Sequence, residues 1–378
     1  MLNRVYLPAL TIVALLMRLA LYKLMAIPFG GLTVAMCQYD CDWYVRLARD
    51  GYGSDSLFAN YGSIPNFAFF PLYPLLLRGM MSVAPFGPYF LGIVLSNLLF
   101  VGFVLLGAVY LRQTRTLKDV SGPDAVLWVL LAVLFPFGYI FSAPYSESLF
   151  ALLTVAAVLM LARRRVLWAA VMCALMCATR PTGVLMVVLI IADRAWHLWR
   201  GRGRADWVAL LGETLLPVAI APLGLSAYML AQYLSIGDAM AFNHVQVLWY
   251  REWLGPWAMA ARGLGAWDWH NVLMPKGLPS ESYDVAWALL GLAASVWMAW
   301  RRRFAEAWLC AASILLPMST GLHSLPRFVA TSPFFLFALF DLLMMVRSPL
   351  VLAGLFGGAG LLHGVVLVFW FIAASSTY

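Results

Sequence analysis

Three arginine clusters punctuate the long apolar stretches of this chain. They are Arg163-Arg164-Arg165, the alternating Arg200, Arg202 and Arg204, and Arg301-Arg302-Arg303. Each cluster lies where one apolar stretch ends and the next begins. In membrane proteins, Lys and Arg concentrate in the cytoplasmic loops between spans. The pattern therefore predicts a chain that crosses a bilayer repeatedly, with these clusters on the cytoplasmic side.

The composition argues against a soluble protein. Charged residues make up 11% of the 378 residues and hydrophobic residues 63%, whereas soluble proteins carry about 25% charged residues. The net charge of +8 follows from arginines at the ends of apolar stretches, so topology explains it better than a nucleic-acid partner. The first apolar stretch, from Tyr6 to Pro28, exceeds a signal-peptide core and contains Arg18 and Lys23. We therefore expect it to be a retained span.

A span requires roughly 20 apolar residues. About eleven stretches approach that length, near residues 6–28, 88–111, 124–142, 145–162, 166–179, 182–199, 207–234, 283–300, 304–321, 328–346 and 349–373. The basic loops alternate consistently if the N-terminus is cytoplasmic and the C-terminus is outside. We expect an all-α polytopic membrane protein with one domain over residues 1–378.

Two long loops, residues 29–87 and 235–282, then face outward. Both are rich in aromatic residues, which are too costly to leave solvated in a disordered segment. We expect amphipathic helices on the membrane surface, one of them over residues 42–49 and stopped by Gly51. A disulfide between Cys37 and Cys41 is open, but their spacing on a single helix would strain it.

Acidic residues in the first outward loop are the first candidates for chemistry. Asp40 and Asp42 are two residues apart in Tyr39-Asp40-Cys41-Asp42, and they can converge on one site if the chain turns there. A carboxylate near the membrane surface can act as a general base. The alternative is that Asp40 or Asp42 only caps the following helix.

Three charges are expected at membrane depth, at outward turns: Glu147, Arg180 and Arg327. Such charges are expensive and usually face a polar cavity or a partner. Glu147 and Arg180 can form a pair, either structural or functional. Arg180 and Arg327 are candidate ligands for a donor phosphate, because the guanidinium fork matches phosphate oxygens.

The second outward loop supplies further candidates. We assign substrate contacts to His244, Gln246, Trp249 and Arg251, together with Tyr145 and Glu147, although a lone histidine is more often structural. No His, Cys or Asp cluster has metal-ligand spacing, and no nucleotide-binding or serine-nucleophile motif occurs. We therefore expect no metal or other cofactor, and no soluble nucleotide donor.

Several of these segments together are similar to a known family. The ordered set resembles the PIG-V-like mannosyltransferases, the bacterial relatives of the enzyme that adds the second mannose to GPI precursors. The resemblance runs from about residue 10 to 345 and rests on Asp40-Cys41-Asp42-Trp43-Tyr44, Arg49-Asp50-Gly51-Tyr52, Phe69-Phe70-Pro71-Leu72-Tyr73-Pro74-Leu75, Phe135-Pro136-Phe137, Ser142-Ala143-Pro144-Tyr145-Ser146-Glu147-Ser148, Ala178-Thr179-Arg180-Pro181-Thr182-Gly183, Gln246 with Trp249, and Pro326-Arg327-Phe328.

The resemblance implies a GT-C fold and an inverting glycosyltransferase in the membrane. Such an enzyme moves mannose or another hexose from a polyprenyl-phosphate sugar to a lipid or glycan acceptor outside the cytoplasm, here at a bacterial inner membrane. It implies Asp40 as the catalytic base and Asp42 as the paired acid. Tyr39 departs from the family, in which tryptophan is usual, and we expect this to change packing.

Two other classes stay open. A transporter or flippase for a lipid-linked or polar substrate usually shows two matching halves and helices broken at the midplane. Here the halves do not match, and the charges cluster at outward ends. A scaffold protein would have no reason to gather acids and arginines at one membrane face.

Overall fold

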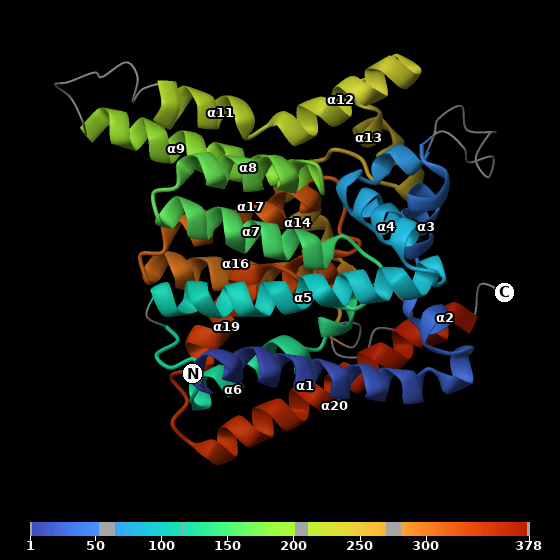
Figure 1. Cartoon of the computed structure of the whole chain (residues 1–378), viewed down its shortest axis with the longest axis vertical. Helices are drawn as coiled ribbons and strands as arrows, with labels where there is room; N and C mark the ends of the chain where they lie inside the picture. The colour runs from blue at the N-terminus through green and yellow to red at the C-terminus, as the bar shows by residue number, and fades with distance from the viewer. Residues whose placement is uncertain (1, 53–64, 115, 201–210, 270–280, 376–378) are drawn as a thin grey trace.

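The computed structural model describes residues 2–52, 65–114, 116–200, 211–269 and 281–375 (Figure 1). Within these ranges the regular structure is helical, without strands. The α-helices are α1 (Leu2–Met25), α2 (Leu32–Met36), α3 (Cys41–Asp50), α4 (Leu72–Val83), α5 (Pro88–Gln113), α6 (Pro123–Leu134), α7 (Glu147–Ala162), α8 (Val166–Cys177), α9 (Val184–Arg200), α11 (Leu216–Ile220), α12 (Leu223–Ile236), α13 (Ala241–His244), α14 (Pro256–Gly265), α16 (Glu281–Trp300), α17 (Phe304–Met318), α18 (Leu325–Ala330), α19 (Pro333–Leu343) and α20 (Pro349–Ser375). Single turns join them at η1 (Ile27–Phe29), η3 (Pro65–Ala68), η4 (Gly138–Phe141), η5 (Pro181–Gly183), η6 (Leu211–Leu215) and η7 (Val245–Trp249).

The long helices lie side by side, and their ends form two faces (Figure 1). One face, which we call the α3 face, carries α2, α3, α4, α13 and the C-terminus. The opposite face, which we call the arginine face, carries the N-terminus and the turns α7–α8 and α16–α17. The two termini therefore lie at opposite ends of the bundle, as the expected topology requires.

Each expected span overlaps at least one described helix, but two of them are interrupted, since α6 ends at Leu134 within 124–142 and α18 ends at Ala330 within 328–346. Residues 207–210 of another expected span lie outside the described part of the chain. Among the described residues, five helices are long and apolar enough to cross a membrane: Val5–Met25, Pro88–Gln113, Gly212–Ile236, Glu281–Trp300 and Pro349–Ile372. Six further apolar helices are shorter. An all-helical chain with candidate membrane spans is thus confirmed for the described residues. The count of about eleven spans and the GT-C fold belong to the proposal below.

Two of the arginine clusters form the same kind of tight turn. Arg164 and Arg302, the middle residues, both adopt a left-handed backbone with φ of 61°. In each turn the following amide donates to the carbonyl five residues earlier, at 2.9 and 2.8 Å. This is the Schellman closure of a helix C-terminus, at a position that usually holds glycine. Of the third cluster, Arg202 and Arg204 lie outside the described residues.

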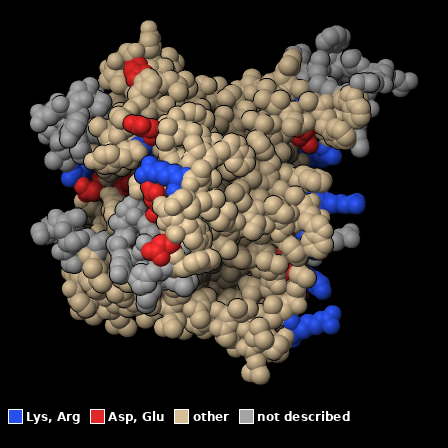
Figure 2. Space-filling model, turned by 180° about the vertical axis from the view of Figure 1, so that it is seen from behind, with Lys and Arg blue, Asp and Glu red and all other residues tan. Residues whose placement is uncertain are grey.

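Charge is segregated between the two faces. Figure 2 shows Lys and Arg side chains projecting from one edge, whereas Asp and Glu gather with some basic side chains toward the opposite edge. The α5 end lies with the arginine turns, because Arg163 Nε donates to Gln113 Oε1 at 3.2 Å. The arginine turn at 163–165 and the end of α5 therefore share one end of the bundle, as the sequence predicted.

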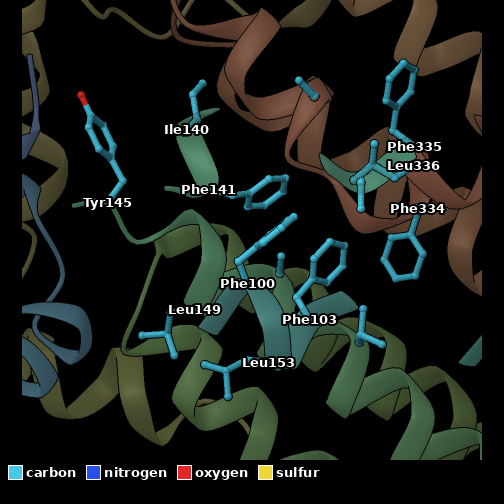
Figure 3. Packing of buried hydrophobic residues seen from close by; sticks show 14 of the residues in the cluster. Phe100, Phe103, Ile140, Phe141, Tyr145, Leu149, Leu153, Phe334, Phe335 and Leu336 are labelled. Carbon is cyan, nitrogen blue, oxygen red and sulfur yellow. The ribbon is translucent and has the colours of Figure 1, made fainter. Parts of the chain in front are cut away.

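Aromatic rings fill the centre of the bundle (Figure 3). Phe141 of η4 packs against Phe100 and Phe103 of α5, with ring centroids 5.2 and 5.5 Å apart. The close approach of α5 to the segment that follows η4 depends on Gly92, where an added Cβ would lie 2.7 Å from Pro144. The core therefore fixes residues 138–148, the segment that carries Tyr145 and Glu147.

The helix expected over residues 42–49 is confirmed as α3, which buries Cys41, Tyr44, Val45, Leu47 and Ala48. It ends at Gly51, whose φ of 84° disfavours any other residue. Further described helices lie in the outward loops, namely α2, α4, α13 and α14. Amphipathic helices in these loops were predicted from their aromatic content.

Cys37 and Cys41 form a disulfide. We expected the disulfide to be strained because both cysteines would lie on one helix, and that placement was wrong. Cys37 ends α2 and Cys41 begins α3, so a turn separates them. Tyr39 takes a left-handed φ of 50° in that turn, and this brings the two Cα atoms to 5.1 Å, within the range of disulfides.

Candidate active site

A cavity of about 450 Å³ opens among residues from both halves of the chain. Its polar end, as we name it, consists of Asp40, Arg180, Asn243, Gln246, Arg251 and Arg327. Its apolar wall consists of Phe150, Leu185, Leu225, Leu309, Leu316 and Phe334. Along α17 the lining runs from Leu309 to Pro317, a rise of about 12 Å. The cavity therefore joins a charged end to a long hydrophobic wall inside the bundle.

Asp40 occupies the residue before α3, but its side chain makes no capping hydrogen bond. Its carboxylate faces the cavity and is 23% exposed, and Oδ2 accepts a hydrogen bond from Arg327 Nη1 at 2.6 Å. The capping alternative is thus not seen for this residue. Because the carboxylate does not cap α3, it is available to a cation from a distant part of the chain.

The backbone of Asp40 is held by Tyr145 from the opposite side. The Tyr145 hydroxyl accepts a hydrogen bond from the Asp40 amide at 3.0 Å and donates one to Gln38 O at 2.6 Å. Tyr145 is buried and does not belong to the cavity lining. With the disulfide, it fixes the loop from Cys37 to Cys41 and therefore the direction of the Asp40 carboxylate.

Glu147 joins the two candidate phosphate ligands. Its Oε1 lies 3.2 Å from Arg180 Nη1 and 3.2 Å from Arg327 Nε. The Glu147 side chain is only 1% exposed and lies behind the arginines, outside the cavity lining. The pairing expected between Glu147 and Arg180 is present, and Arg327 shares it. The four residues make a chain from Asp40 through Arg327 and Glu147 to Arg180.

The charge of Arg327 is strongly maintained. Burial acts to lower its pKa, but Asp40 and Glu147 more than offset burial and raise the pKa above the usual value. The guanidinium also lies over the rings of Tyr145 and Phe328, 5.4 and 5.1 Å from their centroids. Arg327 is therefore a fixed cation at the polar end.

A tight turn presents Arg180. Residues 178–183 connect α8 to α9, and Gly183 packs so closely that an added Cβ would lie 2.6 Å from the Cys177 amide nitrogen. The Arg180 guanidinium lies 4.9 Å from the Phe328 ring centroid. The Ala178–Gly183 motif therefore positions one cation, and its glycine is required sterically.

Arg251 is the third arginine of the polar end. It donates from Nη2 to His323 O at 3.1 Å. Burial, and then the charge of Arg327, lower its pKa to about 10. Arg251 therefore stays protonated near neutral pH, in surroundings that disfavour another positive charge.

Gln246 and Trp249 also line the cavity. Trp249 packs edge-on against Trp43 and Phe69, with centroids 6.1 and 5.9 Å apart. Sequence reasoning did not single out Tyr44 and Thr320, which line the cavity as well. Tyr44 belonged to the quoted Asp40–Tyr44 motif, whereas Thr320 carried no signal in its surroundings.

Besides Tyr145 and Glu147, two more of the expected residues lie outside the cavity lining. Asp42 contacts Arg46 Nε at 2.6 Å and accepts from the Tyr89 hydroxyl at 2.7 Å, because residues two apart on a helix do not share a face. The two carboxylates therefore do not converge. His244 is 64% exposed and pairs with Asp238 at 2.8 Å, outside the cavity lining.

This arrangement defines a membrane protein with a carboxylate and three arginines at the end of a hydrophobic cavity. The family model described as Mannosyltransferase (PIG-V) matches residues 21–201. The PIG-V-like family predicted from the motifs is confirmed by this match, which supports a mannosyltransferase and hence a glycosyltransferase activity. The matched segment holds Asp40, Glu147 and Arg180. A search of curated proteins found no match.

Proposed function

We propose that the protein is an inverting glycosyltransferase of the GT-C fold, with about eleven spans. It moves mannose, or another hexose, from a polyprenyl-phosphate sugar to a lipid or glycan acceptor. The observation that carries this proposal is the Asp40–Arg327 ion pair of 2.6 Å at the polar end of the cavity. This contact between a candidate base and a candidate phosphate ligand, beside an apolar wall suited to a prenyl chain, supports the proposal.

The charges supply the chemistry of one displacement step. Asp40 takes the proton of the acceptor hydroxyl, and the acceptor oxygen attacks the anomeric carbon. The bond from that carbon to the phosphate oxygen breaks, and its electron pair stays on the leaving phosphate. Arg180 and Arg327 stabilise the charge that develops there. Attack from the face opposite the leaving group inverts the anomeric configuration.

The same proposal extends to the cofactors that the protein needs and to its location in the cell. The donor brings its own phosphate leaving group, so we propose a reaction independent of metal ions and other cofactors. The arginine face is cytoplasmic by the positive-inside tendency, and the α3 face and cavity lie on the extracytoplasmic side of a bacterial inner membrane. Asp42 and His244 then have roles outside the reacting centre.

A reconstitution assay tests the proposal. Purified protein in liposomes receives radiolabelled polyprenyl-phosphate mannose and an alkyl mannoside acceptor, with and without EDTA. We expect transfer to the acceptor in both, and none when GDP-mannose is the only donor. Movement of the lipid-linked sugar across the bilayer without transfer would instead identify a flippase. Transfer abolished by EDTA and restored by a divalent cation would overturn metal independence.

A further inference from the structure

We infer that Arg251 is the anchor that binds the donor phosphate in the ground state, while Arg327 serves the departing phosphate. This inference rests on the proposed function, and it divides two roles among three arginines. Neither Arg251 nor any division of roles follows from the family match, which ends at residue 201.

Two of the three arginines already form ion pairs with carboxylates. Arg327 contacts Asp40 and Glu147, and Arg180 contacts Glu147. These two arginines share two carboxylates at 2.6 to 3.2 Å. An incoming phosphate would have to displace a carboxylate to take either guanidinium fully. Their availability in the free protein is therefore limited.

Arg251 differs in its surroundings. No carboxylate oxygen of a described residue lies within 4.0 Å of the Arg251 guanidinium, the limit for an ion pair. The Arg251 guanidinium instead donates a hydrogen bond to the neutral carbonyl of His323. A guanidinium has five N–H donors, so most of its donors remain for a ligand. The nearby charges of Arg327 and Arg180 act against its own, while Asp40 and Asp284 favour it from beyond ion-pair distance. A partly buried cation of this kind favours an anion.

The backbone holds Arg251 in place. The next amide, that of Glu252, donates to Thr320 O at 3.0 Å, and the Leu254 amide donates to Ser319 O at 3.0 Å. Tyr250, the preceding residue, takes a left-handed φ of 55°. These contacts attach the arginine to the end of α17, whose side forms part of the cavity. The fork is thus presented to a ligand before the ligand arrives.

The net charge of the polar end matches the charge of the donor phosphate before and after transfer. Arg180, Arg251 and Arg327 against Asp40 and Glu147 leave one positive charge at this end of the cavity. A sugar phosphodiester carries one negative charge, which matches it. When the acceptor proton moves to Asp40, this carboxylate becomes neutral and releases Arg327. At that moment the leaving phosphate monoester gains its second negative charge, and Arg327 is free to bind it.

The division of roles gives a kinetic signature. Loss of a contact made equally in the ground state and transition state raises KM and leaves kcat unchanged. Loss of a contact that strengthens in the transition state lowers kcat. We therefore expect Arg251→Gln to raise the donor KM about 10- to 100-fold with little change in kcat. Arg327→Gln should act mainly on kcat.

A binding experiment separates the anchor from the general proposal. Purified wild type, Arg251→Gln and Arg251→Lys are titrated with a short-chain prenyl phosphate and with the corresponding prenol. The matched control is Arg262→Gln, an exposed arginine paired with Glu281 outside the cavity. We expect wild type and the control to prefer the phosphate. Arg251→Gln should lose that preference about 10- to 100-fold, keep its affinity for the prenol, and be partly rescued as Arg251→Lys.

Each other result has a definite meaning. If Arg251→Gln keeps the full preference for the phosphate while wild type transfers mannose, the anchor is wrong and the proposed function stands. If the Arg262 control loses the preference equally, general surface charge explains the effect and the anchor is again wrong. If wild-type protein binds phosphate and prenol alike, both the anchor and the proposed donor class are overturned. Unchanged affinity for the prenol verifies that the variants are folded.

Discussion

Arg327 Nη1 lies 2.6 Å from Asp40 Oδ2, although the two residues are 287 positions apart in the chain. The proposed base and a proposed phosphate ligand are thus one ion pair. Residues in direct contact do not have additive effects when both are replaced. In the proposed mechanism, the pair therefore links proton transfer at the acceptor to charge development at the donor.

The first prediction concerns the base. Asp40→Asn keeps the shape of the side chain and removes its basicity, so transfer should fall about 10²- to 10⁴-fold with the fold retained. The measurement is the rate of transfer from polyprenyl-phosphate mannose by purified enzyme. Asp50→Asn is the matched control, because Asp50 lies at the other end of α3 and pairs with Arg49.

A near wild-type rate for folded Asp40→Asn would remove Asp40 from the reaction. Asp42 would then be the next candidate, although its contacts with Arg46 and Tyr89 predict a mild effect for Asp42→Asn. The comparison of both variants in one assay decides which carboxylate is the base.

The second prediction uses the ion pair itself. Arg327→Gln should lower kcat, and Arg180→Ala should raise the donor KM or lower kcat. Combining Asp40→Asn with Arg327→Gln should cost less than the two separate losses together, because the two side chains act as one unit. Strict additivity would argue against the coupling, and unchanged kinetics in both arginine variants would exclude them as phosphate ligands.

The third prediction concerns Glu147, which holds two arginines from behind. Glu147→Gln leaves two buried guanidiniums short of one negative charge, and removing one partner of a buried pair typically costs about 3–5 kcal/mol. We expect a lower midpoint of thermal unfolding in detergent and a raised donor KM. Stability equal to wild type would show that Asp40 alone compensates both arginines.

The fourth prediction concerns the disulfide beside the base. Replacing Cys37 and Cys41 together with serine opens a short loop, which costs about 2 kcal/mol in the chain-entropy model. We expect a larger fractional loss of transfer than of stability, because Asp40 lies inside that loop. Reductant should lower the activity of the wild type and leave the double variant unchanged. The free cysteines Cys173, Cys177 and Cys310 are buried and do not confuse this comparison.

The fifth prediction concerns orientation. Single cysteines at Ser82, near the α3 face, and at Arg302, in the arginine turn, should be labelled from opposite sides of the membrane. Impermeant reagent added to intact cells should reach residue 82 alone. Labelling of both from the same side would contradict the assignment of the 163–165 and 301–303 turns to the cytoplasm.

Much of the fold could be predicted because its signals are local. Apolar stretches set the helices, and Gly51 sets the end of α3 by its positive φ. The Glu147–Arg180 pair was predictable as well, since two costly charges at neighbouring outward turns have few alternatives. These inferences needed only spacing, residue type and the cost of a charge in the membrane.

What could not be predicted depends on contacts between distant segments or on the exact turn of the backbone. The partner of Asp40 comes from α18, and no pattern in the sequence links them. The disulfide was underestimated because Tyr39 turns the chain between the cysteines. Asp42 was expected in the site because it lies two residues from Asp40, but its position on α3 decides where its side chain points, toward Arg46 and Tyr89.

The polar end of the cavity is built from two parts of the chain, and the family model matches one of them. The matched segment supplies Asp40, Glu147 and Arg180, while Arg251 and Arg327 come from beyond residue 201. The family model thus covers the proposed base and one proposed phosphate ligand, whereas the other two arginines reach the cavity from the unmatched part of the chain. A chain that kept only the matched segment would therefore retain the proposed base and lack two of the three arginines that line the cavity with it.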